Sequence, residues 1–387
     1  MNWTTSCLGL TKAEAFHGVF TSVAAPKPFI EKSYFPPKPY PSFFFQRSSQ
    51  KPHLSFSHNA RTSKSIGIIR EWDYGGPFSS GKRRLRADGD DDYMVWTSFG
   101  VGSKLKLAIE TGIHETIGIE LVALIVNNIL TFGAKPAYLA LLHSSMVLDD
   151  AFSKKVIKGV LDGCRQSGCK FLGEKAIEKV NLYFEGEYDL GCFAKGIVKK
   201  DSVIDGKNIV AGDYLIGLPS SAVHWSGFSL VRRALAESGL SLKDQLPGGC
   251  GKPITLGEAL MAPTVIYVKQ VLDIISKGGV KAITHITGGG LMDNITRVLP
   301  KGLGATIYRD TWEVPAVLKW IQEVGRIEDA VMRRTFGMGI GMVLVVSPEA
   351  ASRILQDATS KPSLERHGGN LAYTIGEVSR REGVTYL

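Results

Sequence analysis

A candidate phosphate site lies in residues 95–108, which read VWTSFGVGSKLKLA. The centre of this stretch is Gly100-Val101-Gly102-Ser103-Lys104, between an apolar run that predicts a strand and a segment that predicts a helix. Glycines let backbone amides approach an anion, and Lys104 supplies a cation. Mg²⁺ on a bound nucleotide would need acidic oxygens as well, but the residue before Gly100 is Phe99. The motif predicts phosphate binding without an adjacent metal ligand.

Three further polar or glycine-rich stretches occur at the ends of predicted strands or the starts of predicted helices, where α/β proteins bind ligands. They are LGEKAIEK (172–179), PSSAVHWSGFSLVRR (219–233) and HITGGGLMDNITR (285–297). Their candidate residues are Glu178, His224, His285, Gly288, Gly289, Gly290, Asn294 and Arg297.

Each of these signals also has a purely structural interpretation. Lys104 and Glu178 could be solvated charges at the ends of elements, and a lone histidine is often a hydrogen-bonded structural residue. The triple glycine could be a tight turn without a ligand. Trp312, Trp320 and Phe336 are best interpreted as core residues.

Strand and helix patterns alternate along residues 93–387, which predicts two α/β domains joined near residue 212. In the first domain we expect strands at 93–97, 136–142, 169–172 and 188–199 and helices at 103–111, 117–134 and 149–166. In the second we expect strands at 213–218, 280–286, 341–347 and 371–377 and helices at 228–238, 264–277, 288–298, 315–324, 327–335 and 348–356. Residues 71–92 are predicted to be a linker, and 197–213 a hinge.

The net charge of +9 belongs entirely to the N-terminal leader. Residues 1–86 hold 13 Lys and Arg against 4 Asp and Glu, whereas residues 87–387 hold 33 of each. The leader is also rich in Ser and poor in acids, which favours an organelle transit peptide over residues 1–70. A chloroplast address is favoured over a mitochondrial one, and a disordered basic tail is the alternative. Nucleic-acid binding is disfavoured because the leader's aromatic residues are not interleaved with a basic face.

The apolar run 117–134 is long enough to span a membrane, but it contains Glu120, Asn127, Asn128 and Thr131. At about 100° per residue, Glu120, Asn127 and Thr131 share one helix face. A buried helix with a polar stripe toward a cleft therefore fits better than a membrane span.

The five cysteines form no C-x-x-C pair, so neither a disulfide framework nor a zinc site is indicated.

Taken together, these motifs resemble the aminoimidazole ribonucleotide synthetase family, also called phosphoribosylformylglycinamidine cyclo-ligase. The resemblance covers residue 93 to the C-terminus. It is close in LKLAIETGIHETIGIELVALIVNN, EGEYDLGCFAKGIVKKDSVIDGKNIVAGD, GFSLVRRALAESGLSLKDQLPGG, APTVIYVKQVLDIISKGGVKAITHITGGG and RRTFGMGIGMV.

The resemblance implies an α/β (α+β) fold with an ATP-binding and dimerisation domain at 93–212 and a C-terminal α/β domain at 213–387. The first domain would form a β-barrel across a homodimer. The implied reaction is the ATP- and Mg²⁺-dependent ring closure of formylglycinamidine ribonucleotide in purine synthesis. Lys104, Glu178 and His224 would be catalytic, Glu178 would also bind metal, and Gly100, Gly102, Lys104 and Asn127 would bind the cofactor. His285, the triple glycine, Asn294 and Arg297 would bind substrate.

The chain departs from the family pattern at charged positions. Phe99 replaces the Asp of Gly-Thr-Asp-Gly-Val-Gly-Thr-Lys, Asn128 replaces the Asp of Val-Asn-Asp, and Lys175 replaces the first Glu of Gly-Gly-Glu-Thr-Ala-Glu-Met-Pro. His-Ser-Asn-Gly reads His224-Trp225-Ser226-Gly227, and Phe-Asn reads Phe336-Gly337. The family's N-terminal Tyr-Lys-Asp-Ala-Gly-Val-Asp signature is absent. Two hypotheses follow: an organellar cyclo-ligase, or a catalytically impaired paralogue that acts as a dimer partner or has no activity.

Overall fold

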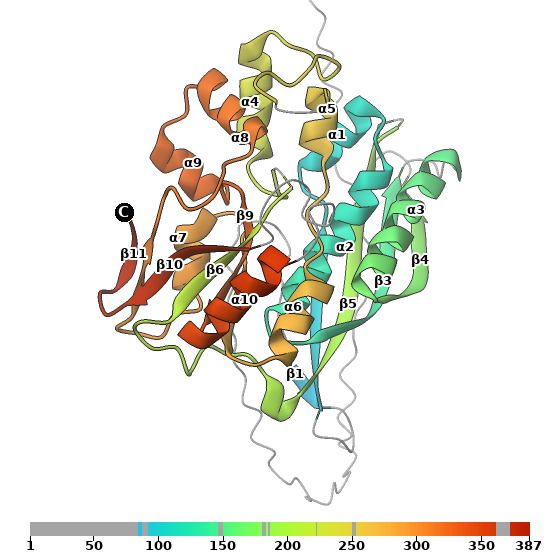
Figure 1. Ribbon diagram of the computed structural model, residues 1–387. Helices are drawn as coiled ribbons and strands as arrows, with labels where there is room; N and C mark the ends of the chain where they lie inside the picture. The colour runs from blue at the N-terminus through green and yellow to red at the C-terminus, as the bar shows by residue number, and fades with distance from the viewer. Residues whose placement is uncertain are drawn as a thin grey trace, which may run out of the picture. The chain divides into compact units, whose positions relative to one another are not determined.

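The computed structural model describes residues 84–86, 92–145, 150–179, 183–184, 186–221, 223–249, 253–360 and 372–387. All of them belong to one compact unit, Ser65–Leu387. The predicted transit peptide at 1–70 and most of the predicted linker at 71–92 lie outside the described residues. Within the described part, a mixed α/β fold is built on two sheets (Figure 1).

The first sheet has five strands in the order β1-β2-β5-β3-β4. Its strands are β1 (Arg84–Arg86), β2 (Asp92–Gly100), β3 (Lys135–Ser145), β4 (Lys170–Glu178) and β5 (Tyr188–Lys199). Its helices are α1 (Lys104–Thr111), α2 (Glu115–Leu130) and α3 (Asp150–Ser167). Only the β3–β4 pairing is parallel, and β1 shows that regular structure begins inside the segment predicted as a linker.

The second sheet has six strands in the order β11-β8-β10-β6-β9-β7. Its strands are β6 (Tyr214–Pro219), β7 (Val280–His285), β8 (Gly304–Ile307), β9 (Ile340–Val346), β10 (Tyr373–Ser379) and β11 (Gly383–Tyr386). The helices are α4 (Phe228–Ser238), α5 (Leu256–Met261), α6 (Val268–Ser276), α7 (Gly290–Thr296), α8 (Ala316–Val324), α9 (Asp329–Thr335) and α10 (Pro348–Ser360). The short helix η1 (Lys200–Ser202) lies between the sheets in the sequence.

Most of the long elements agree with the sequence predictions, but several short ones were not expected. The helix α5 and the strands β8 and β11, which have six, four and four residues, were not predicted. The helix predicted at 264–277 was wrong at its start, because α6 begins at Val268. The preceding residues instead hydrogen bond to side chains of α2.

The strand β5 shows how the first sheet distributes its two faces. Alternate residues of β5 are buried, and the buried set includes Leu190, Cys192 and Ala194. The thiol of Cys192 lies 3.7 Å from the carbonyl oxygen of Leu121, so this face packs on α2. The opposite face leaves large apolar side chains exposed, among them Leu172 on β4 and Phe193 on β5.

The interpretation of three aromatic residues as core is confirmed. Trp320 and Phe336 belong to the larger buried cluster, which includes residues of α2 and of both sheets. Trp312 belongs to a smaller cluster in the second sheet. Its indole Nε1 donates a 2.8 Å hydrogen bond to the carbonyl of Met338, so the buried polar atom is satisfied.

The apolar run at 117–134 forms most of α2, and the interpretation of a buried helix with a polar stripe is confirmed. The helix has 16 residues, and Glu120 and Asn127 are fully buried within it. In the described part of the chain, no helix has the length and hydrophobicity that crossing a bilayer requires.

Helices α2 and α3 cross closely because glycines face each other at the contact. A Cβ atom on Gly118 would lie 2.7 Å from the backbone nitrogen of Val160, and one on Gly159 would lie 3.2 Å from the Cα atom of Gly118. Both distances are too short for ordinary carbon contacts, so only glycine permits this approach.

We expect Gly159→Ala to lower the free energy of unfolding by about 1–3 kcal/mol, because the added methyl group forces the two helices apart. An exposed helical glycine would behave oppositely, since alanine favours helix by about 1 kcal/mol. The measurement is urea denaturation monitored by circular dichroism. The exposed Gln166→Ala on α3 is the control and should be nearly neutral. Unchanged or increased stability of Gly159→Ala would contradict the close-contact explanation.

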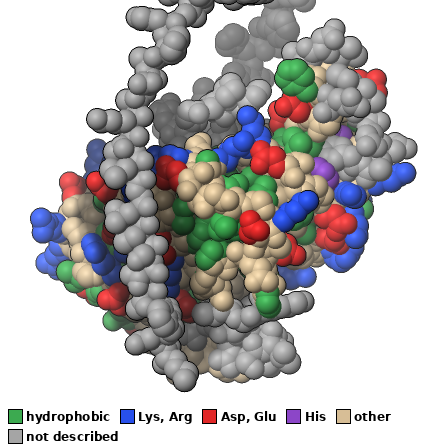
Figure 2. Space-filling model, turned by 90° about the horizontal axis from the view of Figure 1, so that it is seen from above, with side chains coloured by type: hydrophobic (Ala, Val, Ile, Leu, Met, Phe, Trp, Pro, Cys, Tyr) green, Lys and Arg blue, Asp and Glu red, His purple; other side chains and the backbone are tan. Residues whose placement is uncertain are grey.

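Acidic and basic side chains are interspersed on the face shown in Figure 2. This mixture agrees with the equal numbers of acidic and basic residues in 87–387.

Candidate functional site

The loop at residues 100–102 connects the end of β2 to the start of α1. Gly100 pairs with Gly191 at the last position of the β2–β5 ladder, and the backbone nitrogen of Val101 donates to the carbonyl of Leu190 at 3.0 Å. The helix α1 then begins at Lys104. The predicted strand, glycine loop and helix are therefore all present.

Lys104 is fully buried, and its ammonium group already has protein partners. Its Nζ atom lies 2.9 Å from Oε2 of Glu120 on α2 and 2.7 Å from the carbonyl of Ala262. It also lies 5.6 Å from the ring centroid of Phe228, within cation–π range. In this arrangement Lys104 is part of a buried ion pair, which differs from the open phosphate contact expected of it.

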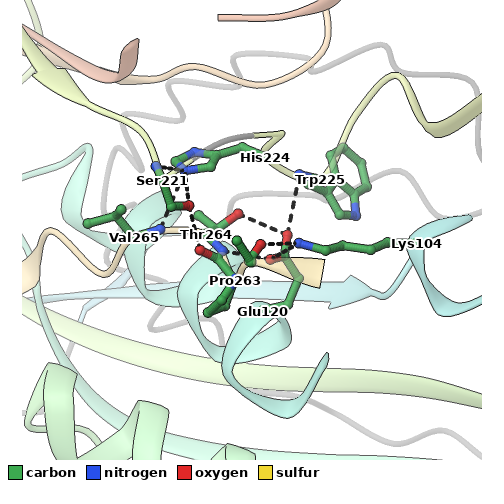
Figure 3. A network of polar contacts seen from close by, with 9 residues as sticks. Lys104, Glu120, Ser221, His224, Trp225, Pro263, Thr264 and Val265 are labelled. Carbon is green, nitrogen blue, oxygen red and sulfur yellow. Dashed lines mark hydrogen bonds and ion pairs between the residues drawn. The ribbon is translucent and has the colours of Figure 1, made fainter. Parts of the chain in front are cut away.

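Glu120 accepts hydrogen bonds from residues on two other segments of the chain (Figure 3). Thr264 donates from its backbone nitrogen at 2.7 Å and from its hydroxyl at 2.8 Å, and the backbone nitrogen of Trp225 donates at 3.3 Å. Both Glu120 and Thr264 are buried. One carboxylate therefore fixes α1, the loop at 224–227 and the segment at 262–265 against α2.

His224 lies beside this network with its imidazole buried. Its Nε2 atom accepts from the backbone nitrogens of Ser221 at 3.3 Å and Val265 at 3.5 Å. The hydroxyl of Ser221 donates to the carbonyl of Pro263 at 2.7 Å. Burial, with a smaller contribution from the charge of Lys104, lowers the pKa of His224 to about 3. The imidazole is therefore neutral at physiological pH, which suits orienting a loop better than donating a proton.

Asn127 also binds the chain segment that follows Thr264. Its Nδ2 donates to the carbonyl of Val265 at 2.8 Å, and its Oδ1 accepts from the backbone nitrogen of Tyr267 at 3.1 Å. Both ends of the amide are thus used within the protein. The polar stripe faces this segment, which corrects the expectation that it faces a cleft.

Glu178 lies at the end of β4, on the same edge of the sheet as the loop at 100–102. It is exposed and stands in register with Ser145, the last residue of β3. Lys175, also exposed, is in register with Leu142, which pairs with Gly191 and through it with Gly100. Three strand spacings of about 4.8 Å therefore separate Lys175 from Gly100.

The residues at the family's acidic positions do not fit Mg²⁺. The ring of Phe99 has no oxygen, and Lys175 carries a positive charge. Asn128 is buried, with its Nδ2 donating to the carbonyl of Leu124 at 2.7 Å. Among the described residues, no group of three or more His, Cys, Asp or Glu side chains is arranged to hold a metal ion. The metal-binding role of Glu178 stays a prediction.

The triple glycine forms the turn that leads into α7, whose first residue is Gly290, and the side chain of Asn294 holds this turn. The Nδ2 of Asn294 donates to the carbonyls of Gly290 at 2.7 Å and Gly288 at 3.1 Å, and its Oδ1 accepts from Arg297 at 3.2 Å. Gly289 and Gly290 have φ angles of 94° and 59°, which favour glycine. His285 is buried at the end of β7. Asn294 thus shapes the predicted substrate loop from within.

The end of α9 brings two of the predicted loops together. The hydroxyl of Ser226 donates to the carbonyl of Thr335 at 3.1 Å. A Cβ atom on Gly227 would meet the ring of Phe336, and one on Gly290 would come within 3.0 Å of the Phe336 carbonyl oxygen. The loops at 224–227 and 288–290 therefore contact the same short segment.

Sequence reasoning missed the central role of Glu120 and did not single out Thr264 or Ser221. The sequence places Glu120 on a polar helix face, but the spacing of the polar residues does not indicate which residue Glu120 pairs with. Thr264 and Ser221 had no signal of their own, because a single Thr or Ser is common on protein surfaces.

Residues 84–198 match the family described as AIR synthase related protein, N-terminal domain, and residues 210–386 match its C-terminal domain. The chain is 62% identical over 296 residues to the chloroplastic phosphoribosylformylglycinamidine cyclo-ligase of Arabidopsis thaliana. It is equally identical to the chloroplastic/mitochondrial enzyme of Vigna unguiculata, and both alignments cover 76% of this chain and 74% of the relative.

Among solved structures, the chain resembles AaThiL complexed with AMPPCP and TMP. The TM-score is 0.52 with 14% sequence identity, and the match covers 79% of this chain and 86% of the other. Identity this low indicates a shared fold only.

Proposed function

Because the chain belongs to the AIR synthase family, we propose that it is a phosphoribosylformylglycinamidine cyclo-ligase of purine (IMP) biosynthesis. The observation that carries the proposal is the 62% identity to two curated plant cyclo-ligases over 296 residues. Both halves of the family are present, since the two domain matches together extend from residue 84 to residue 386.

The proposed reaction closes an imidazole ring at the expense of ATP. The γ-phosphoryl group of ATP is transferred to the amide oxygen of formylglycinamidine ribonucleotide. The internal amine then attacks that carbon, the C–O bond breaks, and the products are aminoimidazole ribonucleotide, ADP and phosphate. Phosphoryl transfer depends on positioned charge and dipoles, so the site must bind phosphate firmly.

Residues at two places support phosphate and substrate binding in this proposal. Gly100 and Gly102 are the first and last residues of the loop before α1. The triple glycine leads into α7 and is held by Asn294, which also accepts a hydrogen bond from Arg297. Neutral His224 orients the loop at 224–227. Glu178 retains its family position, and its catalytic role remains part of the proposal. Phe99, Asn128 and Lys175 do not provide ligands for Mg²⁺.

ATP binding is also supported by fold similarity. AaThiL, a structure of the same fold, is complexed with AMPPCP. A plastid location is proposed because the two plant relatives are named chloroplastic and chloroplastic/mitochondrial.

Activity is tested by incubating the full chain with formylglycinamidine ribonucleotide and ATP and measuring the imidazole product and ADP. The comparison variant carries Phe99→Asp, Asn128→Asp and Lys175→Glu. We expect turnover by the unmodified chain, with one ADP released per ring closed. If only the triple variant turns over, the proposal fails and the catalytically impaired paralogue becomes the better description.

We further propose that the chain forms a homodimer through the exposed face of the first sheet. The side chains exposed there include Tyr138, Leu142, Leu172, Phe193 and Ile197, each at least 37% exposed. An apolar sheet face of this kind is commonly covered by another chain. The family resemblance implies that the covering chain is a second copy, which would complete a β-barrel.

We expect Leu172→Glu to shift the chain from dimer to monomer, because it places a charge on the most exposed of these apolar side chains. Light scattering after size exclusion measures the mass. Exposed Leu161 on α3, which lies outside this sheet face, provides the control Leu161→Glu. A Leu172→Glu variant that remains as dimeric as the unmodified chain would exclude this face as the interface.

A further inference from the structure

Two residues that depart from the family motifs contact each other. Phe99 stands where the family has Asp, on β2, and Trp225 stands where it has Ser, in the loop before α4. Their ring centroids are 6.0 Å apart and the rings are nearly perpendicular, at 89°. Edge-to-face packing of this kind is favourable for aromatic rings. The two departures are therefore one structural feature.

The indole of Trp225 lies against the predicted phosphate loop. A Cβ atom on Gly102 would lie 3.6 Å from the indole Nε1 and 4.0 Å from Cε2, so the ring is in contact distance of the loop. The Nε1 atom is buried, and it has no hydrogen-bond acceptor among the described residues. An N–H donor without an acceptor is unfavourable, and a phosphate oxygen at the loop would satisfy it.

The backbone holds Trp225 in this position. Its φ angle is +26°, a left-handed value that a residue other than glycine seldom adopts. Its backbone nitrogen donates to Oε1 of Glu120 at 3.3 Å, and the hydroxyl of the next residue, Ser226, donates a hydrogen bond to the carbonyl of Thr335. A conformation of this kind persists only when its surroundings fix it.

We propose that Phe99 and Trp225 are a specificity-determining pair that keeps divalent cations from binding at the loop of residues 100–102. As a consequence, this chain binds ATP equally well with and without Mg²⁺. The pair fills the metal-ligand position with an apolar ring and places a neutral N–H donor beside the phosphate position. An apolar ring offers no oxygen to a hard cation, whereas an N–H can bond a phosphate oxygen directly. The inference rests on the proposed function, because that function supplies ATP as the ligand.

The test measures ATP affinity of the full chain by isothermal titration calorimetry, once with MgCl₂ and once with EDTA. For the unmodified chain we expect dissociation constants that agree within about twofold. For the double variant Phe99→Asp with Trp225→Ser we expect Mg²⁺ to tighten binding by at least about tenfold, because a carboxylate then faces the loop.

A matched control distinguishes the effect of the negative charge at position 99 from the effect of the smaller side chain. Phe99→Asn with Trp225→Ser has the same shape as the Asp variant but no negative charge, and its affinity should not respond to Mg²⁺. Thermal melting confirms that each variant is folded, and Phe99→Leu alone provides a milder change with the same expectation as the unmodified chain.

Three results would overturn the proposal: tighter ATP binding by the unmodified chain in Mg²⁺, no ATP binding by it in either condition, or the same Mg²⁺ response in the Asp and Asn variants. Ring closure is measured separately. If the chain binds ATP independently of Mg²⁺ but forms no imidazole, the role proposed for Phe99 and Trp225 is supported and the proposed function is contradicted. Failure of this inference can therefore be distinguished from failure of the proposed function.

Discussion

Glu120→Ala is expected to lower the free energy of unfolding by about 3–5 kcal/mol, because it leaves the ammonium of Lys104 buried without its counter-charge. Both side chains are fully buried and their charged atoms are 2.9 Å apart. The same substitution also removes the acceptor for Thr264 and for the backbone nitrogen of Trp225. Urea denaturation, followed by circular dichroism, measures the change.

The converse substitution, Lys104→Met, should cost less, about 1–3 kcal/mol. The carboxylate of Glu120 keeps three hydrogen bonds from Thr264 and Trp225, whereas Lys104 without Glu120 keeps a single hydrogen bond, to the carbonyl of Ala262. As a control, Lys158→Ala breaks an exposed ion pair with Glu115 and should change stability by less than about 1 kcal/mol. If Lys104→Met proves as damaging as Glu120→Ala, the carboxylate is not the centre of this network.

Much of the fold could be predicted from sequence because long periodic segments determine it. The helix from Glu115 to Leu130 was recognised by its apolar run and its polar stripe, and β5 by its alternation. The residues before α6 could not be placed in the same way. Their local sequence favours a helix, but Glu120 and Asn127 bind the backbone from Thr264 to Tyr267 in another conformation. A contact between distant segments overrode the local preference.

The candidate site shows the same division between local pattern and tertiary contact. The glycine loop before α1 and the triple glycine before α7 were predicted, since each needs only a strand end and a helix start. The partner of Lys104 was not predicted, because its pairing with Glu120 depends on how α1 packs against α2. The contact between Phe99 and Trp225 could not be predicted from sequence either, because the two residues are far apart in the chain, although each departs from the family pattern.

Acidification is expected to destabilise the protein through His224. Burial and the nearby charge of Lys104 lower the pKa of this imidazole to about 3, against an ordinary value of 6.5. At a pH between these two pKa values, the unfolded chain binds a proton at His224 and the folded protein does not. The contribution of His224 to the free energy of unfolding is therefore fully present above about pH 7, and it is lost as the pH falls from about 6.5 toward 3. The loss due to His224 is about 2 kcal/mol by pH 5.

His224→Gln isolates this contribution, because glutamine can accept a hydrogen bond but does not titrate. The free energy of unfolding of both proteins is measured by urea denaturation at pH 7 and at pH 5. The unmodified chain should lose about 2 kcal/mol more than the variant over this interval, since the other histidines contribute equally to both and cancel. Parallel losses in the two proteins would mean that His224 gains a proton without unfolding. Its imidazole would then have to leave the contacts with Ser221 and Val265, and the loop that carries Trp225 would move with it.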